Sequence, residues 1–200
     1  LSFQFYKKAF VHPEIGVFCV KIIILDINLH QDFIKTINAE NYIIDESLIE
    51  EIYRPRKEFS HKGNFGKTCI VAGSFGKIGA AVLETKAAMK TGSGITYIRA
   101  PKCGYEVLQT SCLEAMFLNG GEDFVVNFEV EEGVTYGVGP GLGTQQQTTQ
   151  HFLNFLKNYD KPLVLDADAL NMLAENSDNL KYIPKESIIT PHPKEFERLF

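Results

Sequence analysis

Short apolar runs alternate with longer amphipathic stretches from about residue 67 onward, and this alternation predicts strands and helices in turn. The expected strands cover residues 67–72, 95–100, 123–128, 133–138, 162–167 and 187–190. The first expected helix has Ala80, Leu83 and Ala87 on one face and stops before Gly92. Further helices end at Tyr159, cover residues 169–174 and begin at Lys194. Such alternation requires crossover connections, so we predict an α/β fold with a mainly parallel sheet and helices on both faces.

The chain before about residue 57 lacks this regularity. Residues 1–28 end in a strand-like stretch over residues 17–27, and a single strand cannot bury itself. Basic residues around Pro55 mark a linker within a polar, mixed segment. We therefore predict that residues 1–50 are the tail of a preceding domain with its linker, and that residues 51–200 belong to a second domain. The chain starts without Met and stops in an expected helix, so we expect an internal fragment.

Composition narrows the classes of protein that this chain fits. The 200 residues are 44% hydrophobic and 22% charged, which suffices for a packed core. A net charge of -5 without basic runs argues against nucleic acid or an anionic membrane as the main partner. No apolar run is long enough to cross a bilayer. The four cysteines form no Cys-x-x-Cys pair and the histidines lack zinc spacing, so we expect free thiols, a cytoplasmic protein and no bound structural metal.

A glycine-rich loop follows the expected strand 133–138. Its glycines leave little side-chain bulk, so a ligand can approach the backbone closely; they are Gly137, Gly139, Gly141 and Gly143. We expect Thr144 to cap the next helix, whose apolar face contains Phe152, Phe155 and Leu156. The loop would then deliver an anion or a nucleotide-like ligand to a helix N-terminus. A tight turn after a strand explains the same glycines, and the residues alone leave both interpretations open.

Other candidate positions also follow expected strands, at the edge where parallel α/β sheets bind ligands. The loop 73–79 has glycines at positions 73, 76 and 79, and this spacing matches neither the dinucleotide fingerprint nor the P-loop. Asp168 is most simply a helix N-cap, whereas Asp166 is a candidate ligand-facing acceptor. His192 lies between two prolines that hold it extended, and Glu195 follows in the first helical turn. This bracing favours a site role for His192.

Six blocks of sequence together resemble the NAD(P)H-hydrate dehydratase family. In chain order they are HKGNFG at 61–66, AGS at 72–74 with GAA at 79–81, SG at 93–94, GPGLG at 139–143, DADAL at 166–170 and TPHPKEF at 190–196. The resemblance covers residues 52–200. The first fifty residues resemble the end of the NAD(P)H-hydrate epimerase domain at Lys7, Gly16 and Asp26. The resemblance implies a ribokinase-like fold, truncated here at its C-terminus.

The family's activity repairs hydrated nicotinamide cofactors. A nucleotide, ADP in bacterial bifunctional members and ATP in eukaryotes, phosphorylates the hydroxyl of the hydrated ring, and elimination of phosphate restores the double bond. The resemblance therefore implies ADP-dependent dehydration of (6S)-NAD(P)H hydrate by a bifunctional enzyme that also epimerises this hydrate. We take ADP as the expected cofactor, ATP as the alternative and Mg²⁺ as a candidate ion. The expected partner is a small dinucleotide, and we also expect a homo-oligomer.

The resemblance and the strand-end positions together give a set of substrate-binding residues. They are Ala80, Gly139, Gly141, Gly143, Asp166, His192, Glu195 and Arg198. The family's catalytic Asp is expected beyond Phe200, so no catalytic residue is assigned here and the fragment alone is expected to be inactive. Two alternatives stay open, a ribokinase-like kinase of small molecules and a non-catalytic nucleotide-binding module. The GPGLG and TPHPKEF blocks favour the dehydratase.

Overall fold

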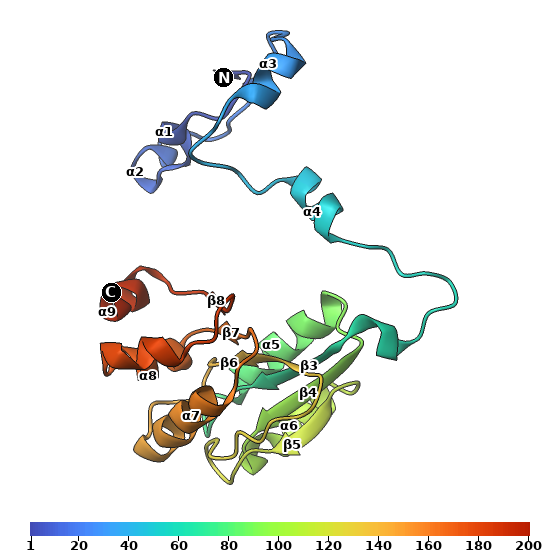
Figure 1. Cartoon of the computed structure of the whole chain (residues 1–200), viewed down its shortest axis with the longest axis vertical. Coiled ribbons are helices and arrows are strands. Elements are labelled where there is room, and N and C mark those ends of the chain that lie inside the picture. Colours follow the sequence, from blue (N-terminus) through green and yellow to red (C-terminus); the bar gives the residue numbers. More distant parts are fainter. The chain divides into compact units, whose positions relative to one another are not determined.

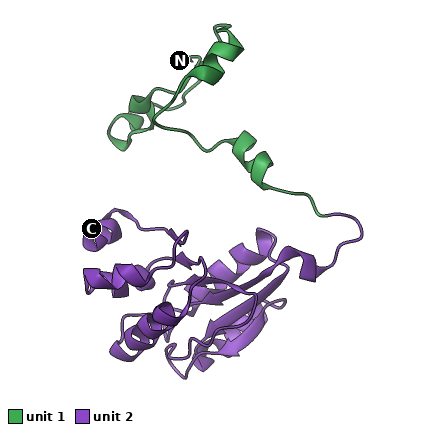
Figure 2. Ribbon diagram, viewed as in Figure 1, with its two compact units in different colours: residues 1–56 green, residues 57–200 purple.

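The computed structural model describes residues 1–200 as two compact units, Leu1–Arg56 and Lys57–Phe200 (Figure 2). The first unit contains six short elements, which are β1 (Ser2–Phe3), α1 (Lys8–Val11), α2 (Pro13–Gly16), β2 (Ile24–Leu25), α3 (Gln31–Thr36) and α4 (Glu46–Ile52). Its two strands pair in parallel. The expected strand over residues 17–27 is wrong except at Ile24–Leu25, because β1 offers a partner to two residues alone.

The second unit is built on a six-stranded sheet in which every pairing is parallel. Its strands are β3 (Lys67–Val71), β4 (Ile95–Ala100), β5 (Met116–Asn119), β6 (Thr135–Val138), β7 (Val164–Leu165) and β8 (Ile188–Ile189). Its helices are η1 (Lys62–Phe65), α5 (Ile78–Lys90), η2 (Lys102–Gly104), α6 (Tyr105–Ser111), α7 (Gln146–Asn158), α8 (Asp168–Ala174), η3 (Ser177–Tyr182) and α9 (Pro193–Leu199). The strand order is β5-β4-β3-β6-β7-β8 (Figure 1).

Helices cover the sheet from both sides, and each side has its own apolar core. On one side α5 and α6 pack on the central strands through Ala81 and Leu108, against Ile70 and Ile98. On the other side α7 and α8 bury a larger cluster that includes Phe152, Phe155, Leu156, Leu170 and Leu173. The prediction of an α/β fold with a mainly parallel sheet and helices on both faces is confirmed.

Two expectations about individual elements are wrong. Residues 123–128 form no strand, because the amides of Val126 and Asn127 both donate to the carbonyl of Gly120 and fold the segment back on itself. The third strand of this sheet in chain order is instead β5, which lies at one edge of the sheet. The face of α5 that contains Leu83 and Ala87 points to solvent, while Ala81 and Thr85 pack inward. Alanines at helical spacing occur on more than one face of α5, so the periodicity did not choose between them.

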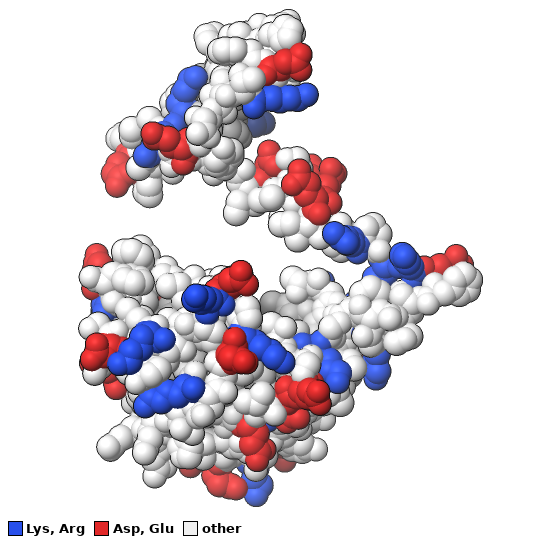
Figure 3. Space-filling view, viewed as in Figure 1, with Lys and Arg blue, Asp and Glu red and all other residues white.

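The charges, cysteines and helix lengths of the chain show no unusual feature. On the side of the second unit that Figure 3 shows, acidic and basic side chains are interspersed rather than gathered by sign. All four cysteines are free. No helix is long and apolar enough to cross a membrane.

Candidate functional site

The neighbouring strands β3, β6 and β7 end side by side, and the loops that follow them lock together. The amide of Gly73 donates to the carbonyl of Pro140 at 2.9 Å, and the hydroxyl of Ser74 donates to the carbonyl of Gly141 at 2.7 Å. The amide of Gly139 donates to the carbonyl of Val71 at 3.1 Å. The glycine loop (residues 139–143) is therefore held in place by the loop after β3.

Asp168 fastens the glycine loop from the other side. Its Oδ2 accepts a hydrogen bond from the amide of Gly143 at 2.8 Å and lies 3.4 Å from Nζ of Lys77. Its Oδ1 accepts from Nδ2 of Asn171 at 3.4 Å, and the guanidinium of Arg198 donates to Oδ1 of Asn171. The interpretation of Asp168 as an N-cap is wrong, because Ala167 occupies that position and Asp168 is the first residue of α8. Asp168 instead connects α5, the glycine loop, α8 and α9.

The glycines are required by the backbone itself. Gly139 has a φ of +143°, and a Cβ at this position would lie 1.8 Å from the carbonyl oxygen of Asp166. Gly141 has a φ of +70°, and its Cβ would lie 2.9 Å from the carbonyl oxygen of Lys77 and 3.1 Å from Cβ of Ala80. Side chains would be strained at both positions whatever the space. The tight-turn interpretation is therefore correct for these glycines, and it is compatible with a ligand at the loop.

Two long helices begin at this edge without a side-chain cap. The N-cap residues of α5 and α7 are Lys77 and Gln145, and neither side chain accepts a hydrogen bond from its helix. The expected cap at Thr144 is wrong, because α7 begins one residue later than the expectation required. Uncapped amides at a helix N-terminus carry partial positive charge and bind anions. With the Lys77 ammonium beside the glycine loop, this edge is chemically suited to phosphate groups.

His192 has a capping role that the sequence interpretation did not include. Its Nδ1 accepts from the amide of Lys194 at 3.2 Å, while its own amide donates to Oε2 of Glu195 at 2.9 Å. The Nε2 atom of His192 lies 3.2 Å from Oε1 of the same glutamate. Glu195 is buried and His192 is half exposed. These contacts fix the start of α9, and a contact of His192 with a cofactor stays a prediction.

Glu84 is a partly buried glutamate that the sequence interpretation missed. It lies on α5, and its Oε2 is shielded from solvent without a hydrogen-bond partner. Burial, together with the nearby charge of Asp166, raises the pKa of Glu84 to about 7. The residue stands in a run of small and apolar residues, where no local pattern distinguishes it.

The expected site residues fall into two groups. Ala80, the glycines and Asp166 come together where β3, β6 and β7 end. His192, Glu195 and Arg198 lie at the start of α9 and within it, and Arg198 reaches the first group through Asn171 and Asp168. Sequence reasoning missed Ser74, Lys77 and Asn171 as loop contacts. Ser74 and Lys77 stand in the loop 73–79 that the sequence did single out, whereas Asn171 carries no such signal.

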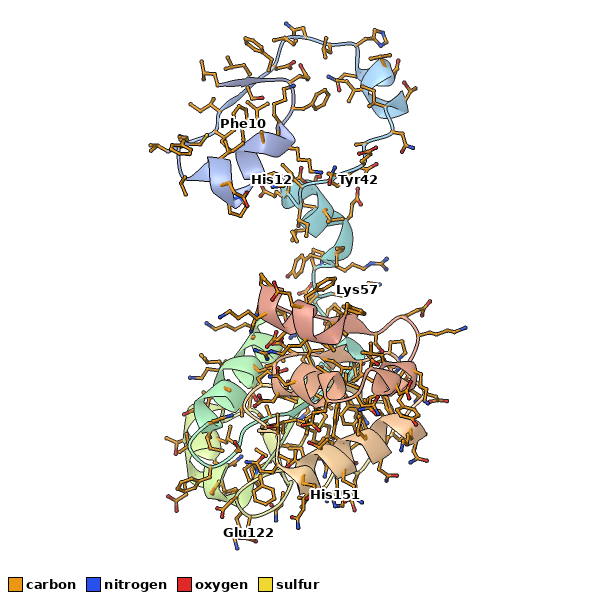
Figure 4. All side chains as sticks on the ribbon, turned by 90° about the vertical axis from the view of Figure 1, so that its left-hand side faces the viewer. Phe10, His12, Tyr42, Lys57, Glu122 and His151 are labelled. Carbon is orange, nitrogen blue, oxygen red and sulfur yellow. The ribbon has the colours of Figure 1, made fainter.

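The surface has two hollows along α7, and the chain has no cluster of metal ligands. A hollow of about 500 Å³ begins at Thr144 beside the glycine loop and is bounded by Thr149, Leu153 and Glu175. Another of about 310 Å³ lies along α7 around His151. Figure 4 shows where His151 lies on this helix. No three His, Cys, Asp or Glu side chains are grouped so that they could hold a metal ion.

The parallel sheet with helices on both faces defines a class of protein, the α/β proteins of ribokinase-like fold. In agreement, the fold matches that of a ribokinase-like superfamily protein from Enterococcus faecalis with a TM-score of 0.66 and 23% identity, covering 81% of this chain and 59% of the other. Within this class the chain belongs to the NAD(P)H-hydrate dehydratase family, whose model matches residues 68–200.

Individual relatives are similar to different extents of the chain. An ADP-dependent (S)-NAD(P)H-hydrate dehydratase of Neisseria meningitidis is 35% identical over 151 residues, which cover 74% of this chain and 50% of the relative. A bifunctional NAD(P)H-hydrate repair enzyme of Dictyoglomus turgidum is 27% identical over 97% of this chain and 41% of the relative. The Bacillus subtilis ADP/ATP-dependent NAD(P)H-hydrate dehydratase, co-crystallised with ATP/Mg²⁺, matches with a TM-score of 0.58 and 29% identity, covering 72% of this chain and 50% of the other. The chain therefore spans about half the length of these relatives, or less.

Proposed function

We propose that this chain is part of an ADP-dependent dehydratase that converts (6S)-NAD(P)H hydrate to NAD(P)H. The observation that carries the proposal is the edge where α5 and α7 begin uncapped on either side of the glycine loop, with the Lys77 ammonium beside them. A dinucleotide carries a pyrophosphate, and such an edge binds it through backbone amides. Membership of the dehydratase family supplies the reaction.

The chemistry explains why a backbone-rich site suits this reaction. The hydroxyl on the hydrated ring is a poor leaving group, so the enzyme must first convert it to a phosphate ester with a nucleotide. Catalysis then depends on holding two phosphate-bearing molecules in line and neutralising the charge that develops. In this chain, the glycine loop and the N-termini of α5 and α7 would bind and orient the dinucleotide, and Asp168 would keep Gly143 in position.

We assign the substrate-binding role to Ala80, Gly139, Gly141, Gly143, Asp166, His192, Glu195 and Arg198. The grouping of Ala80, the glycines and Asp166 at one edge supports the first five of these. The link from Arg198 through Asn171 to Asp168 supports a joint role for the α9 residues. We propose Mg²⁺ as the ion that accompanies the phosphates of the nucleotide.

Three further features are proposals of the same kind. The resemblance of residues 1–50 to an epimerase domain, and the bifunctional relative that matches 97% of the chain, support a protein that also epimerises NAD(P)H hydrate. Four free cysteines fit a reducing compartment and hence a cytoplasmic protein. The homo-oligomeric state stays a prediction.

The test is an assay of hydrated NADH with ADP, with ATP, or with neither, in which the absorbance of reduced nicotinamide is followed. A protein of the relatives' length that contains this sequence should restore the absorbance with ADP, and the 200-residue chain should not, because the resemblance implies that further segments supply the nucleotide site and the general base. Restoration without any nucleotide would rule out activation by phosphorylation. Phosphate transfer to an unrelated hydroxyl compound, with no recovery of NADH, would favour the small-molecule kinase.

A further inference from the structure

Glu84 is a titratable residue near the site that the proposed reaction does not use, and its Oε2 is shielded from solvent. It lies in the middle of α5 and faces the sheet at β6, where Gly137 has no side chain. A Cβ at Gly137 would lie 2.9 Å from Oε1 of Glu84 and 3.3 Å from Cδ1 of Ile70. The carboxyl therefore fills the space that a side chain on β6 would otherwise occupy.

The surroundings of this carboxyl contain no cation and no hydrogen-bond donor to it. Its Oε2 is shielded from solvent and unpartnered. β6 and β3 present Gly137 and Ile70, which are uncharged, and the charged group that acts on Glu84 is Asp166 at the end of β7. A buried carboxylate without a partner is costly, and a second carboxylate nearby increases that cost. The neutral acid avoids both costs, and the pKa of Glu84, raised to about 7, agrees with this.

We propose that Glu84 is a positioning residue for the anionic ligand: it is protonated when the ligand is bound, so that it adds no negative charge beside Asp166 at the ligand-binding edge. This inference rests on the proposed function for the identity of the ligand, a phosphate-bearing dinucleotide, and not for the proton on Glu84. When Glu84 loses its proton, the edge gains a second negative charge and repels the pyrophosphate. Ligand binding and proton uptake by Glu84 are therefore linked.

The proton is tested directly on the 200-residue chain by NMR of glutamate labelled with carbon-13 at the side-chain carboxyl. One resonance should titrate with a midpoint of about pH 7, and it should be absent from Glu84→Gln. Asp166→Asn should lower that midpoint, because it removes the neighbouring charge. Glu106→Gln, on the exposed side of α6, is the matched control and should leave the resonance unchanged. The proposal is overturned if every glutamate titrates near its ordinary pKa, or if the high midpoint persists in Glu84→Gln.

The link to the ligand is tested by calorimetric binding of NAD⁺, whose pyrophosphate does not titrate near neutral pH. If the bound ligand raises the pKa of Glu84 by one unit, the affinity of the unsubstituted protein should fall about fivefold between pH 6 and pH 8. The affinity of Glu84→Gln should stay constant over this range. An equal fall in both proteins would overturn the ligand half of the proposal. Absence of NAD⁺ binding at both pH values would count against the proposed function. The NMR titration would still show whether Glu84 has a raised pKa.

Discussion

Single residues at the carboxyl edge of the sheet are constrained by contacts with the backbone of other loops. Gly139 lies against the carbonyl of Asp166, and Asp168 accepts the amide of Gly143. Both contacts join segments that are well separated in the sequence. Substitutions here should therefore change the folding of the site as well as its binding.

Gly139→Ala should destabilise the protein by at least about 3 kcal/mol, because the new Cβ would lie 1.8 Å from the carbonyl oxygen of Asp166 and φ is +143°. Urea unfolding followed by circular dichroism measures the effect. Gly79→Ala is the control, since a Cβ there meets nothing within 4 Å and alanine favours the helix by about 0.5–1 kcal/mol. Equal stability of the two variants would contradict the close approach at Gly139.

Asp168→Ala should cost about 1–3 kcal/mol of stability, because it leaves the buried amide of Gly143 without its acceptor. Asp168→Asn keeps an oxygen in that position and should cost less than about 1 kcal/mol. Amide hydrogen exchange at Gly143 gives a local readout, and protection should fall much more in the Ala variant than in the Asn variant. Unchanged exchange in Asp168→Ala would show that the hydrogen bond does not hold the loop.

The N-termini of three helices lie at this site. α5 and α7 begin at the glycine loop without a side-chain cap, whereas α9 begins with a reciprocal cap between His192 and Glu195. Prolines on both sides of His192 limit the local conformations and support the cap. The imidazole could therefore serve the helix, the ligand or both, and these roles are separable by substitution.

His192→Ala removes the cap and the imidazole, whereas His192→Asn keeps a good N-cap residue. The Ala variant should lose about 1 kcal/mol of stability, and the Asn variant should lose little. If the imidazole also contacts the hydrated cofactor, both variants should raise the apparent KM about tenfold with a smaller effect on kcat. Steady-state kinetics in the complete enzyme would show it. Normal kinetics in His192→Asn would limit His192 to the capping role.

At the scale of the whole molecule, the buried apolar residues lie in the second unit. Both hydrophobic clusters lie within residues 57–200, while Ser2 is the one residue buried in Leu1–Arg56. Large side chains such as Phe18 and Val20 in the first unit are exposed. The stability of the chain should therefore reside in the second unit.

Deleting residues 1–56 should leave the thermal midpoint of the second unit within about 2 °C of its value in the full chain. Differential scanning calorimetry of both proteins provides the comparison. A drop of more than about 5 °C would show that the first unit contributes to the folded state of the second.

Global stability should also depend on pH through Glu84. Its pKa is about 7 in the folded chain and 4.5 for an ordinary glutamate, so the folded state binds this proton more tightly. The stabilisation that this provides is complete below pH 4.5 and is lost as the pH rises through 7, by on the order of 3 kcal/mol. Urea unfolding of the unsubstituted chain and of Glu84→Gln at several pH values measures the contribution of Glu84 to the free energy of unfolding. A constant difference between the two proteins would show that Glu84 has an ordinary pKa.

The sequence by itself determined the class of fold and the position of the glycine loop. Short apolar runs between amphipathic stretches are local signals, and they located β3, β4 and β6 closely. The apolar face of α7 was equally clear, because Phe152, Phe155 and Leu156 recur at helical spacing and are buried. The order of the sequence blocks pointed to the dehydratase family, whose model matches residues 68–200.

Tertiary structure alone decided which partners these elements meet. Asp168 binds Gly143 and lies beside Lys77, 25 and 91 positions away in the sequence, so no local pattern distinguished this role from a helix cap. The inward face of α5 was set by the sheet beneath it, because its alanines allow more than one face. Residues 123–128 lack a strand partner and fold back on Gly120 despite their apolar content. The shifted pKa of Glu84 likewise arises from burial and from Asp166, and both depend on how α5 packs against β6 and β7.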